Sequence, residues 1–316
     1  MQTERFDLTV LKIRMVIRLL FNPLKYFVET ARTGSIKAAS ERLNVAASAI
    51  SRHIQIFEAD ADAPLFERHA RGMGLTAAGE IYMRHAQSVL AEAENTQLQI
   101  DALKGLKRGH IRICCVEGVV AGPLAEAQAA FKRTYPEISY NVRVVSTANV
   151  MQVVRDGEAD VGVAFQSSPV GGVHVQRRIV DPLRAILPPG HPLCSKTELL
   201  LEDLAGYPIA MPDWTFGIRQ VMDAACHVHQ QRLNISLETN SVEALRSFAR
   251  TGAGITVLPS LAVKSDLVRG DSVAVPIRED LFERSSMDIV VREGRKLTTL
   301  IQEFLGYMFV NFKPIL

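Results

Sequence analysis

The fold of this chain is decided by the stretch NPLKYFVETARTGSIKAASERLNVAASAISRHIQIF, residues 22–57. Its first two residues, Asn22 and Pro23, form a helix start signal, because Asn caps free N–H groups and proline tolerates the first helical position. Apolar residues then recur at helical spacing until Gly34, a residue typical of helix ends. The stretch therefore begins with a helix that ends at Gly34.

Two more helices are expected within the same stretch. Ser35 is the expected cap of a short helix over residues 36–43, and Asn44-Val45 forms a tight turn. A third helix is expected over about residues 47–59. Two short helices, a turn of a few residues and a third amphipathic helix form the pattern of a helix-turn-helix.

The third helix has two faces of different chemistry. Ile50, Ile54 and Phe57 recur at i, i+4 and i+7, so we expect them to pack on the first two helices. The opposite stripe is small, polar and basic, and consists of Ser48, Ser51, Arg52 and Gln55. Such a stripe suits a helix in the major groove of DNA, because Arg can bind guanine, Gln can bind adenine and serines allow close approach. Taken by itself, the stripe also fits an ordinary solvated helix face.

A glycine-punctuated basic segment follows the third helix. Residues 64–68 (PLFER) run into residues 69–76 (HARGMGLT), a pattern that favours a two-stranded wing. Arg68 and Arg71 are expected near DNA phosphates, where they set affinity and register rather than sequence preference.

Five motifs then occur in order across residues 19–79. They are LKYFV at 24–28, GSI at 34–36 with AA at 38–39 and Leu43, AISRHI at 49–54, LFER at 65–68 and LTAAG at 75–79. In this order and spacing the segment resembles the LysR-type transcriptional regulators. The resemblance implies a winged helix-turn-helix domain over residues 19–76 that binds double-stranded promoter DNA.

Two departures from the family pattern affect the expected DNA contacts. The family usually has Ser-Gln-Pro where this chain has Ala46, Ala47 and Ser48. Ala46 cannot cap the third helix through its side chain, which costs roughly 1 kcal/mol. Ala47 lacks the amide that reads a base in the family, so the resemblance carries the base-facing role to Ser48, Ser51 and Arg52. The expected DNA-binding set is Ser35, Ala47, Ser48, Ser51, Arg52, Gln55, Arg68 and Arg71.

Two smaller features complete the N-terminal region. Asp62 replaces the usual glycine beyond the third helix, and Asp enters the left-handed backbone region more readily than most residues. Residues 1–18 form an extension before the family's usual start. Met15 would give a more typical beginning, so residues 1–14 are interpreted as a start-site artefact or as an extra basic arm.

A long helix is expected over residues 77–108, capped by Thr76. Its apolar seam alternates in steps of four and three, through Tyr82, Ala86, Val89, Ala93, Thr96, Ile100 and Leu103. At 1.5 Å per residue it spans roughly 45 Å. We interpret it as a dimerisation helix, because one seam surrounded by charges suits a single partner better than a buried core position.

From residue 109 the pattern changes to alternating strands and helices. Strands are expected at residues 111–116, 139–145 and 159–165 with helices between them, which is a parallel βαβαβ unit. A second set follows to residue 266, with strands expected at residues 173–179, 183–187 and 236–239. The remaining chain, with strands expected at residues 272–275 and 288–291, is expected to return to the first lobe. The layout resembles the LysR effector domain, itself similar to periplasmic solute-binding proteins, over residues 109–312. The expected first lobe covers residues 109–165 and 267–312, and the second lobe covers residues 166–266.

Effector-binding residues are expected where strands end and helices begin, because free N–H groups there favour ligands. The set is Glu117, Gly118, Ser146, Thr147, Gln166, Trp214, Thr215, Asn240 and Ser241. The hydroxyl residues are equally compatible with simple helix caps, and Trp214 with a core position. Glu117 stands where the family commonly has a small hydroxyl residue. Its carboxylate either disfavours a simple carboxylate ligand or pairs with an arginine, and both alternatives stay open here.

Composition sets the limits on the class of protein. The chain has 316 residues, 47% hydrophobic residues and a formal net charge of +2, which indicates a folded multi-domain protein and excludes a polycation. The apolar stretch over residues 10–24 is interrupted by Lys12, Arg14 and Arg18, so it predicts neither a membrane span nor an export signal. We therefore expect a cytoplasmic protein without cofactor or metal. By resemblance it is a homodimer through the linker helix and a tetramer through its sensor domains, switched by a small effector.

Three alternatives compete with this interpretation. A dehydrogenase has little support, because no GxGxxG, Walker or GxSxG motif occurs and His227 and His229 do not share a helix face. A transport-type solute-binding module explains residues 110–312 but not the helix-turn-helix. A thiol redox switch would use Cys194 and Cys226, although no basic cluster adjoins either cysteine.

Overall fold

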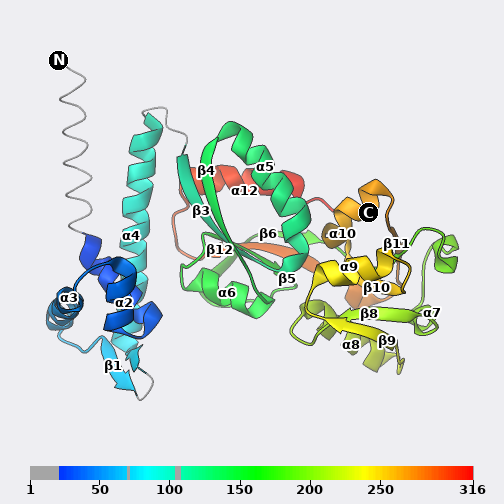
Figure 1. Cartoon of the computed structure of the whole chain (residues 1–316), viewed down its shortest axis with the longest axis horizontal. Coiled ribbons are helices and arrows are strands. Elements are labelled where there is room, and N and C mark those ends of the chain that lie inside the picture. The colour runs from blue at the N-terminus through cyan, green and yellow to red at the C-terminus, as the bar shows by residue number, and fades with distance from the viewer. Residues whose placement is uncertain (1–20, 70–71, 104–107, 316) are drawn as a thin grey trace. The chain divides into compact units, whose positions relative to one another are not determined.

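The computed structural model describes residues 21–69, 72–103 and 108–315. The chain divides near residue 106 into two compact units. The first contains the helix-turn-helix and the long helix, and the second contains two five-stranded sheets (Figure 1). The expected N-terminal extension, residues 1–18, lies outside the described residues.

The first unit contains the three helices that the quoted stretch predicts. They are residues 21–33, α2 (Ile36–Leu43) and α3 (Ala47–Asp60). Phe27, Ile50 and Ile54 are buried in one cluster, because their helical spacing brings them to the same face. The phenyl ring of Phe27 contacts both Phe66 and Tyr82, with ring centroids 4.9 Å apart in each pair. The core of this unit thus joins the helices, the wing and the long helix.

The ends of these helices follow the local sequence. The Ser35 hydroxyl accepts a hydrogen bond from the Ala38 N–H at 3.4 Å and caps α2. Ala46 is the N-cap residue of α3 and makes no side-chain capping bond, as expected for alanine. Asp62 has a φ of 46°, which confirms that Asp occupies the left-handed position where glycine is usual.

The wing is a two-stranded antiparallel ribbon of β1 (Phe66–His69) and β2 (Gly72–Leu75). Its base is fixed to α3, because Glu58 Oε1 accepts hydrogen bonds from the backbone N–H groups of Leu65 and Phe66 at 2.9 and 3.1 Å. Gly79 is required where α4 starts, since a Cβ there would lie 2.0 Å from the Leu65 carbonyl oxygen. Both contacts therefore fix the base of the wing, at Leu65 and Phe66.

The long helix α4 covers Ala77–Leu103, and the Thr76 hydroxyl accepts a hydrogen bond from the Gly79 N–H at 3.0 Å. The expected seam divides into two parts. Tyr82 and Ala86 pack inside the core of the helix-turn-helix. Farther along, Val89 and Ala93 are half-buried. The first part of the seam therefore stabilises the chain's own domain, which corrects its expected role in dimerisation.

The second unit contains two sheets. The first has the strand order β4-β3-β5-β12-β6, made of Glu137–Val144, Arg108–Cys115, Val161–Phe165, Ser286–Arg292 and Val173–Val180. Helices α5 (Ala125–Thr134) and α12 (Thr299–Asn311) cover one face, where the ring centroids of Phe131 and Phe304 lie 5.3 Å apart. Helix α6 (Thr147–Arg155) covers the other face (Figure 1). The central strands β5 and β12 are therefore buried, whereas the edge strands β4 and β6 are largely exposed.

The second sheet has the strand order β11-β7-β10-β8-β9. Its strands are Val273–Pro276, Leu183–Leu187, Ile255–Pro259, Pro208–Pro212 and Asn234–Thr239. Helix α9 (Val242–Arg250) lies on one face and α8 (Gly217–Val228) on the other (Figure 1). Three further helices, α7 (Leu201–Ala205), α10 (Ser260–Arg269) and α11 (Asp280–Glu283), complete this half.

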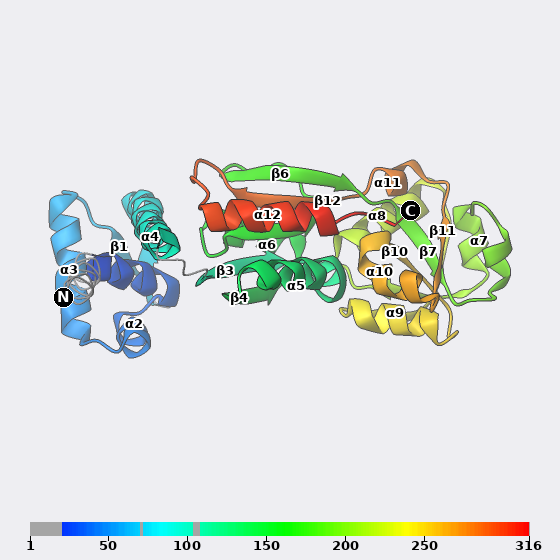
Figure 2. The ribbon, with the colours of Figure 1, turned by 90° about the horizontal axis from the view of Figure 1, so that it is seen from above.

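Two strands belong to a different sheet from the one we expected. Strand β6 pairs antiparallel with β12 in the first sheet, although residues 166–266 were assigned to the second lobe. Strand β11 pairs with β7 in the second sheet, although residues 267–312 were assigned to the first. The chain therefore crosses between the lobes later than expected, at residues 181–182 and 277–285. Figure 2 shows β6 at the edge of its sheet, leading toward the second lobe.

The two crossing segments lie side by side and hold the start of α10. The Asp181 N–H donates to the Ser285 carbonyl oxygen at 2.9 Å. The buried carboxylate of Asp181 accepts hydrogen bonds from the backbone N–H groups of Ser260 and Leu261, each at 2.9 Å. A carboxylate at a helix N-terminus is favoured by the free N–H groups there. The hinge between the lobes is thus tied to the helix that borders both.

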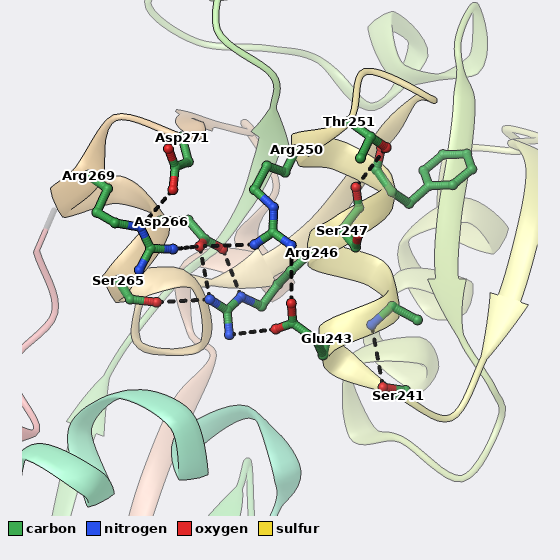
Figure 3. A network of polar contacts seen from close by, with 12 residues as sticks. Ser241, Glu243, Arg246, Ser247, Arg250, Thr251, Ser265, Asp266, Arg269 and Asp271 are labelled. Atoms are coloured by element: carbon green, nitrogen blue, oxygen red, sulfur yellow. Dashed lines mark hydrogen bonds and ion pairs between the residues drawn. The ribbon is translucent and has the colours of Figure 1, made fainter.

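An ion-pair network joins α9 to α10 within the second lobe (Figure 3). Asp266 is fully buried, and its carboxylate accepts hydrogen bonds from Arg246 Nε at 2.7 Å and from Arg269 Nη2 at 2.7 Å. Arg250 Nη1 lies 3.5 Å from the same carboxylate. Because one buried carboxylate meets three arginines, the two helices are held together by polar contacts as well as by packing.

Candidate functional site

The outward face of α3 carries the polar stripe that the sequence predicts. Four of its side chains are exposed, those of Ala47, Ser48, Arg52 and Gln55, and that of Ser51 is half-buried. No carboxylate in the described part of the chain pairs with Arg52, so its guanidinium keeps its donors for another molecule. The short side chains around it let a partner approach the helix closely.

Three further DNA contacts were expected outside this face. Arg68 is exposed on β1, and it makes no ion pair with any described residue. Ser35 is half-buried, and its hydroxyl caps α2. Arg71 lies outside the described residues. The first unit thus carries an exposed arginine on the wing and an exposed polar face on α3.

A cavity of about 240 Å³ lies between the two sheets of the second unit. Six of the nine expected effector residues line it: Glu117, Gly118, Ser146, Thr147, Thr215 and Asn240. They come from segments that the topology brings together at the ends of strands, as in other open α/β sheets. Among the described residues that line the cavity, Glu117 is the one with an ionisable side chain.

The remaining three expected residues do not line the cavity. Trp214 has 76% of its surface exposed, so it takes neither the lining nor the core position that were considered. Gln166 is exposed with a φ of 45°. Ser241 caps α9, accepting from the Ala244 N–H at 3.4 Å, and its hydroxyl also donates to Glu117 Oε1 at 3.2 Å. Ser241 therefore borders the site through Glu117.

The hydroxyl residues of the first lobe differ in what they bind. Thr147 Oγ1 donates to the Phe165 carbonyl oxygen at 3.1 Å and accepts from the Phe165 N–H at 3.2 Å, so it ties α6 to the end of β5. Ser146 is the N-cap residue of α6 but makes no side-chain capping bond. The Ser146 hydroxyl is therefore available to a ligand, whereas that of Thr147 is already engaged.

Apolar lining residues were missed by the sequence reasoning. Val116, Val144 and Val145 end strands, Phe216 and Ile218 begin α8, and Met287 belongs to β12. In the sequence these side chains are indistinguishable from ordinary core residues. Only the packing of the two sheets leaves a space beside them.

The cysteines do not form a redox pair in the structure. All four are free thiols, and Cys114 and Cys115 are buried. Burial raises the pKa of the Cys115 thiol to about 12 and that of Cys114 to about 11, so both stay protonated at neutral pH. Burial, followed by the charge of Asp223, raises the pKa of Cys226. These environments disfavour thiolate chemistry.

The described part of the chain contains neither a cluster of metal ligands nor a helix suited to span a membrane. No three His, Cys, Asp or Glu side chains there come together in a way that could hold a metal ion. Within the same residues no helix has both the length and the apolar character needed to cross a membrane.

Family models account for nearly the whole described chain. The model "Bacterial regulatory helix-turn-helix protein, lysR family" matches residues 21–80. The model "LysR substrate binding domain" matches residues 104–309. The two matches coincide with the helix-turn-helix and the two-sheet unit respectively.

Known proteins of the same architecture are similar along most of the chain. The "Probable RuBisCO transcriptional regulator" of Cyanidioschyzon merolae is 28% identical over 82% of this chain and 89% of its own length. The structure of a single-residue variant of full-length OxyR from Pseudomonas aeruginosa has a TM-score of 0.70 and 20% identity, and covers 92% of this chain and 95% of that one. The Synechocystis CcmR regulatory domain in complex with 2-PG has a TM-score of 0.55 and 22% identity, over 65% of this chain and 98% of that one. With these two structures the likeness is one of fold. Because the family models match both parts of the chain, the protein belongs to the LysR family of DNA-binding transcriptional regulators and is not an enzyme.

Proposed function

We propose that α3 reads promoter DNA in the major groove through Ser48, Ser51 and Arg52. The observation that carries this proposal is the exposed, polar and basic face of α3, on which no described carboxylate neutralises Arg52. Ala47 and Gln55 border the same face, while Arg68, Arg71 and Ser35 approach the phosphates. Phosphate contacts set affinity and register, and base contacts set sequence preference.

The cavity between the sheets is the effector site of the proposed regulator. Nine residues were indicated for this site by strand ends and helix starts: Glu117, Gly118, Ser146, Thr147, Gln166, Trp214, Thr215, Asn240 and Ser241. Support comes from the six that line one cavity and from Ser241, which bonds to Glu117. Gln166 and Trp214 lie away from the lining and have the weakest support in the set.

The proposed regulator acts as an oligomer in the cytoplasm. Two copies pair through the outer half of α4, where Val89, Ala93 and Ile100 are half-buried, and dimers join into a tetramer through residues 109–312. A ligand in the cavity contacts both lobes and so changes their relative positions. In the tetramer this change moves one pair of DNA-binding domains relative to the other pair.

One metabolite is a natural starting point for binding experiments. The CcmR regulatory domain was solved with 2-PG, and that domain shares the fold of the second unit. At 22% identity this likeness concerns the fold, so 2-PG serves as a probe to be measured and is not the proposed effector of this chain.

Selection of DNA sequences by the full-length protein tests the proposed function. A pool of random duplexes is taken through rounds of binding at physiological ionic strength, and the bound fraction is sequenced. We expect enrichment of one motif with two inverted halves, because a symmetric dimer presents two copies of α3. The Arg52→Ala variant is expected to lose part of that motif. A pool that stays random after selection would contradict the proposal.

A further inference from the structure

Among the described residues that line the cavity, Glu117 is the one with a charged side chain. It is the first residue of the short helix Glu117–Val119, which follows β3. Its Oε1 accepts a hydrogen bond from the Ser241 hydroxyl at 3.2 Å. No described group donates to Oε2, and no described Lys or Arg lies within ion-pair distance. Of the two alternatives that the sequence left open, pairing of Glu117 with an arginine is therefore not the one found.

The cations on the surrounding helices are engaged elsewhere. Arg219, on α8, donates to Glu238 at 2.6 Å, and it also pairs with Asp223. Lys264, on α10, pairs with Glu126 at 2.6 Å. Arg246, on α9, is held by Asp266, as described above. The chain therefore supplies no compensating positive side chain to Glu117 from these three helices.

Apolar groups form most of the remaining wall. Val116, Val145, Phe165, Ile218 and Met287 line the cavity beside the carboxylate. A carboxylate that faces an apolar space is costly when a ligand displaces the water around it, unless the ligand itself supplies a donor or a positive charge.

Helix N-termini at the cavity favour negative groups of a ligand, whereas Glu117 favours positive ones. Helices α6 and α8 begin at the cavity, and neither Ser146 nor Phe216 makes a side-chain capping bond. A helix N-terminus carries roughly half an elementary positive charge, so the two together are comparable in size to the charge of a carboxylate. No described N–H group of either helix donates to the Glu117 carboxylate, which therefore still needs a donor of its own. An anionic group is thus tolerated near α6 and α8 only in a ligand that also carries a positive charge for Glu117.

We propose that the effector is a small molecule with a protonated nitrogen, which binds Glu117 Oε2, and with an aliphatic body that fills the apolar wall. This inference rests on the proposed function and specifies the class of effector. The cavity of about 240 Å³ is slightly below the range of about 300 to 1,000 Å³ typical of drug-sized ligands, so the effector is a small metabolite. Free amines and amino-acid zwitterions both belong to this class, whereas ligands with only carboxylate or phosphate charges do not.

The contact with Ser241 gives this ligand a route to regulation. Glu117 belongs to the first lobe, and Ser241 caps α9 in the second. A protonated nitrogen on Glu117 is therefore bound beside a hydrogen bond that joins a lining residue of the first lobe to the cap of α9 in the second lobe. Binding there changes the contact between the lobes, as an allosteric effector must.

The test compares three probes built on one carbon skeleton with the full-length protein. They are 3-methylbutylamine (cation), leucine (zwitterion) and 4-methylpentanoate (anion), each titrated at neutral pH and matched ionic strength while the melting temperature is recorded. We expect the amine or the zwitterion to raise the melting temperature, since a ligand of the folded state stabilises it by mass action. A larger rise with the amine indicates that the effector is a free amine, and a larger rise with leucine indicates that it is an amino acid. The anion alone is expected to have no effect.

Three variants complete the test. Glu117→Gln is expected to weaken binding of the active probe about ten- to a hundredfold, the usual cost of losing a charged hydrogen bond. Glu117→Asp keeps the charge and is expected to keep most of the affinity, which separates loss of charge from loss of folding. The control is Glu202→Gln, since Glu202 is exposed on α7 and makes no described polar contact.

The inference is overturned if neither nitrogen probe binds, if the anion binds more tightly than the amine, or if Glu117→Gln leaves the affinity unchanged. Binding to a selected DNA motif is measured on the same samples. Intact motif binding together with any of these results removes the effector class and leaves the regulator in place. Loss of motif preference in the wild-type protein removes the proposed function instead.

Discussion

Arg52 and Arg68 are both exposed arginines of the first unit, yet their positions assign them different roles. Arg52 lies on the exposed face of α3 that we propose to enter the major groove, and Arg68 lies on the first strand of the wing. We expect Arg52→Ala to cost about 1–3 kcal/mol at one base pair and little at the others. Arg68→Ala is expected to weaken all sequences alike and to reduce the slope of log K against log salt by about 1.

Binding titrations on a set of single-base variants of the selected motif, repeated at several salt concentrations, measure both effects. Equal behaviour of the two variants, in sequence preference and in salt slope, would contradict this division of roles.

Asp266 illustrates how one buried charge stabilises the second lobe. Burial opposes its ionisation, but the hydrogen bonds from Arg246 and the charges of the three arginines hold its pKa below the ordinary value. Asp266→Asn leaves the buried Arg246 without its carboxylate, so we expect a loss of about 3 kcal/mol and a melting temperature several degrees lower. The matched control is Asp271→Asn, because Asp271 is more exposed and pairs only with Arg269. A surface pair contributes about 1 kcal/mol or less.

The same residue predicts a pH dependence. Because the pKa of Asp266 is lower in the folded than in the unfolded protein, its stabilisation is present above the unfolded value and is lost as the pH falls through the folded value. The melting temperatures of the wild type and of Asp266→Asn should therefore converge below about pH 4. A gap that stays constant from neutral to acidic pH would show that the Asp266 charge does not stabilise the fold.

Residues whose role is local were predictable from sequence, and residues whose role depends on distant partners were not. Ser35 and Asp62 act through their own backbone neighbourhood, so capping and left-handed propensity were sufficient. The partner of Glu117 is Ser241, 124 residues away in the chain, and no spacing rule connects them. Trp214 is exposed because a short Asp213–Thr215 turn points it outward, which composition does not reveal.

At the scale of elements, the helices of the first unit could be predicted from the sequence, because the apolar residues of each helix recur on a single face. The seam of α4 was ambiguous, because a heptad pattern says that a helix packs but not against which chain. Tyr82 and Ala86 pack within the same domain, which leaves Val89, Ala93 and Ile100 for a partner.

A charge placed on the outer part of α4 tests its role in dimerisation. Val89→Lys puts an ammonium group into the expected seam, so we expect the dimer to dissociate at protein concentrations about tenfold or more above those of the wild type. Ser88→Lys is the control, since Ser88 is exposed and one residue removed from the seam. Sedimentation equilibrium gives both association constants. A Val89→Lys protein as dimeric as the control would mean that the copies pair elsewhere.

The strands of the second unit were predicted with less success. Strand β8 was missed, because it is bounded by Pro208 and Pro212, and proline normally argues against a central strand. Strands β6 and β11 were recognised but placed in the wrong sheets, since periodicity marks a strand and does not identify its neighbour. Pairing of segments more than a hundred residues apart, such as β6 with β12, is set by the folded topology.

At the scale of the whole molecule, the chain combines a domain with an unpaired polar face and a two-sheet unit with a cavity between its lobes. The family resemblance predicted both parts, because the motifs of each are local and occur in order. The hinge contact of Asp181 with α10 and the Glu117–Ser241 bond became visible only in the structure. Both contacts connect the lobes, so the ligand that we propose for the cavity would act on the two lobes together.

The preference of the protein for its own promoter is the most direct measure of whether α3 reads DNA. The affinity of the full-length protein for the region upstream of its own gene is compared with that for a shuffled duplex of equal length and composition, at physiological ionic strength. The wild type should bind the upstream region at least about a thousandfold more tightly, as specific DNA-binding proteins do, and Arg52→Ala should lose much of that ratio. Equal affinity of the wild type for the two duplexes, with and without small metabolites, would contradict the assignment of this helix to sequence recognition.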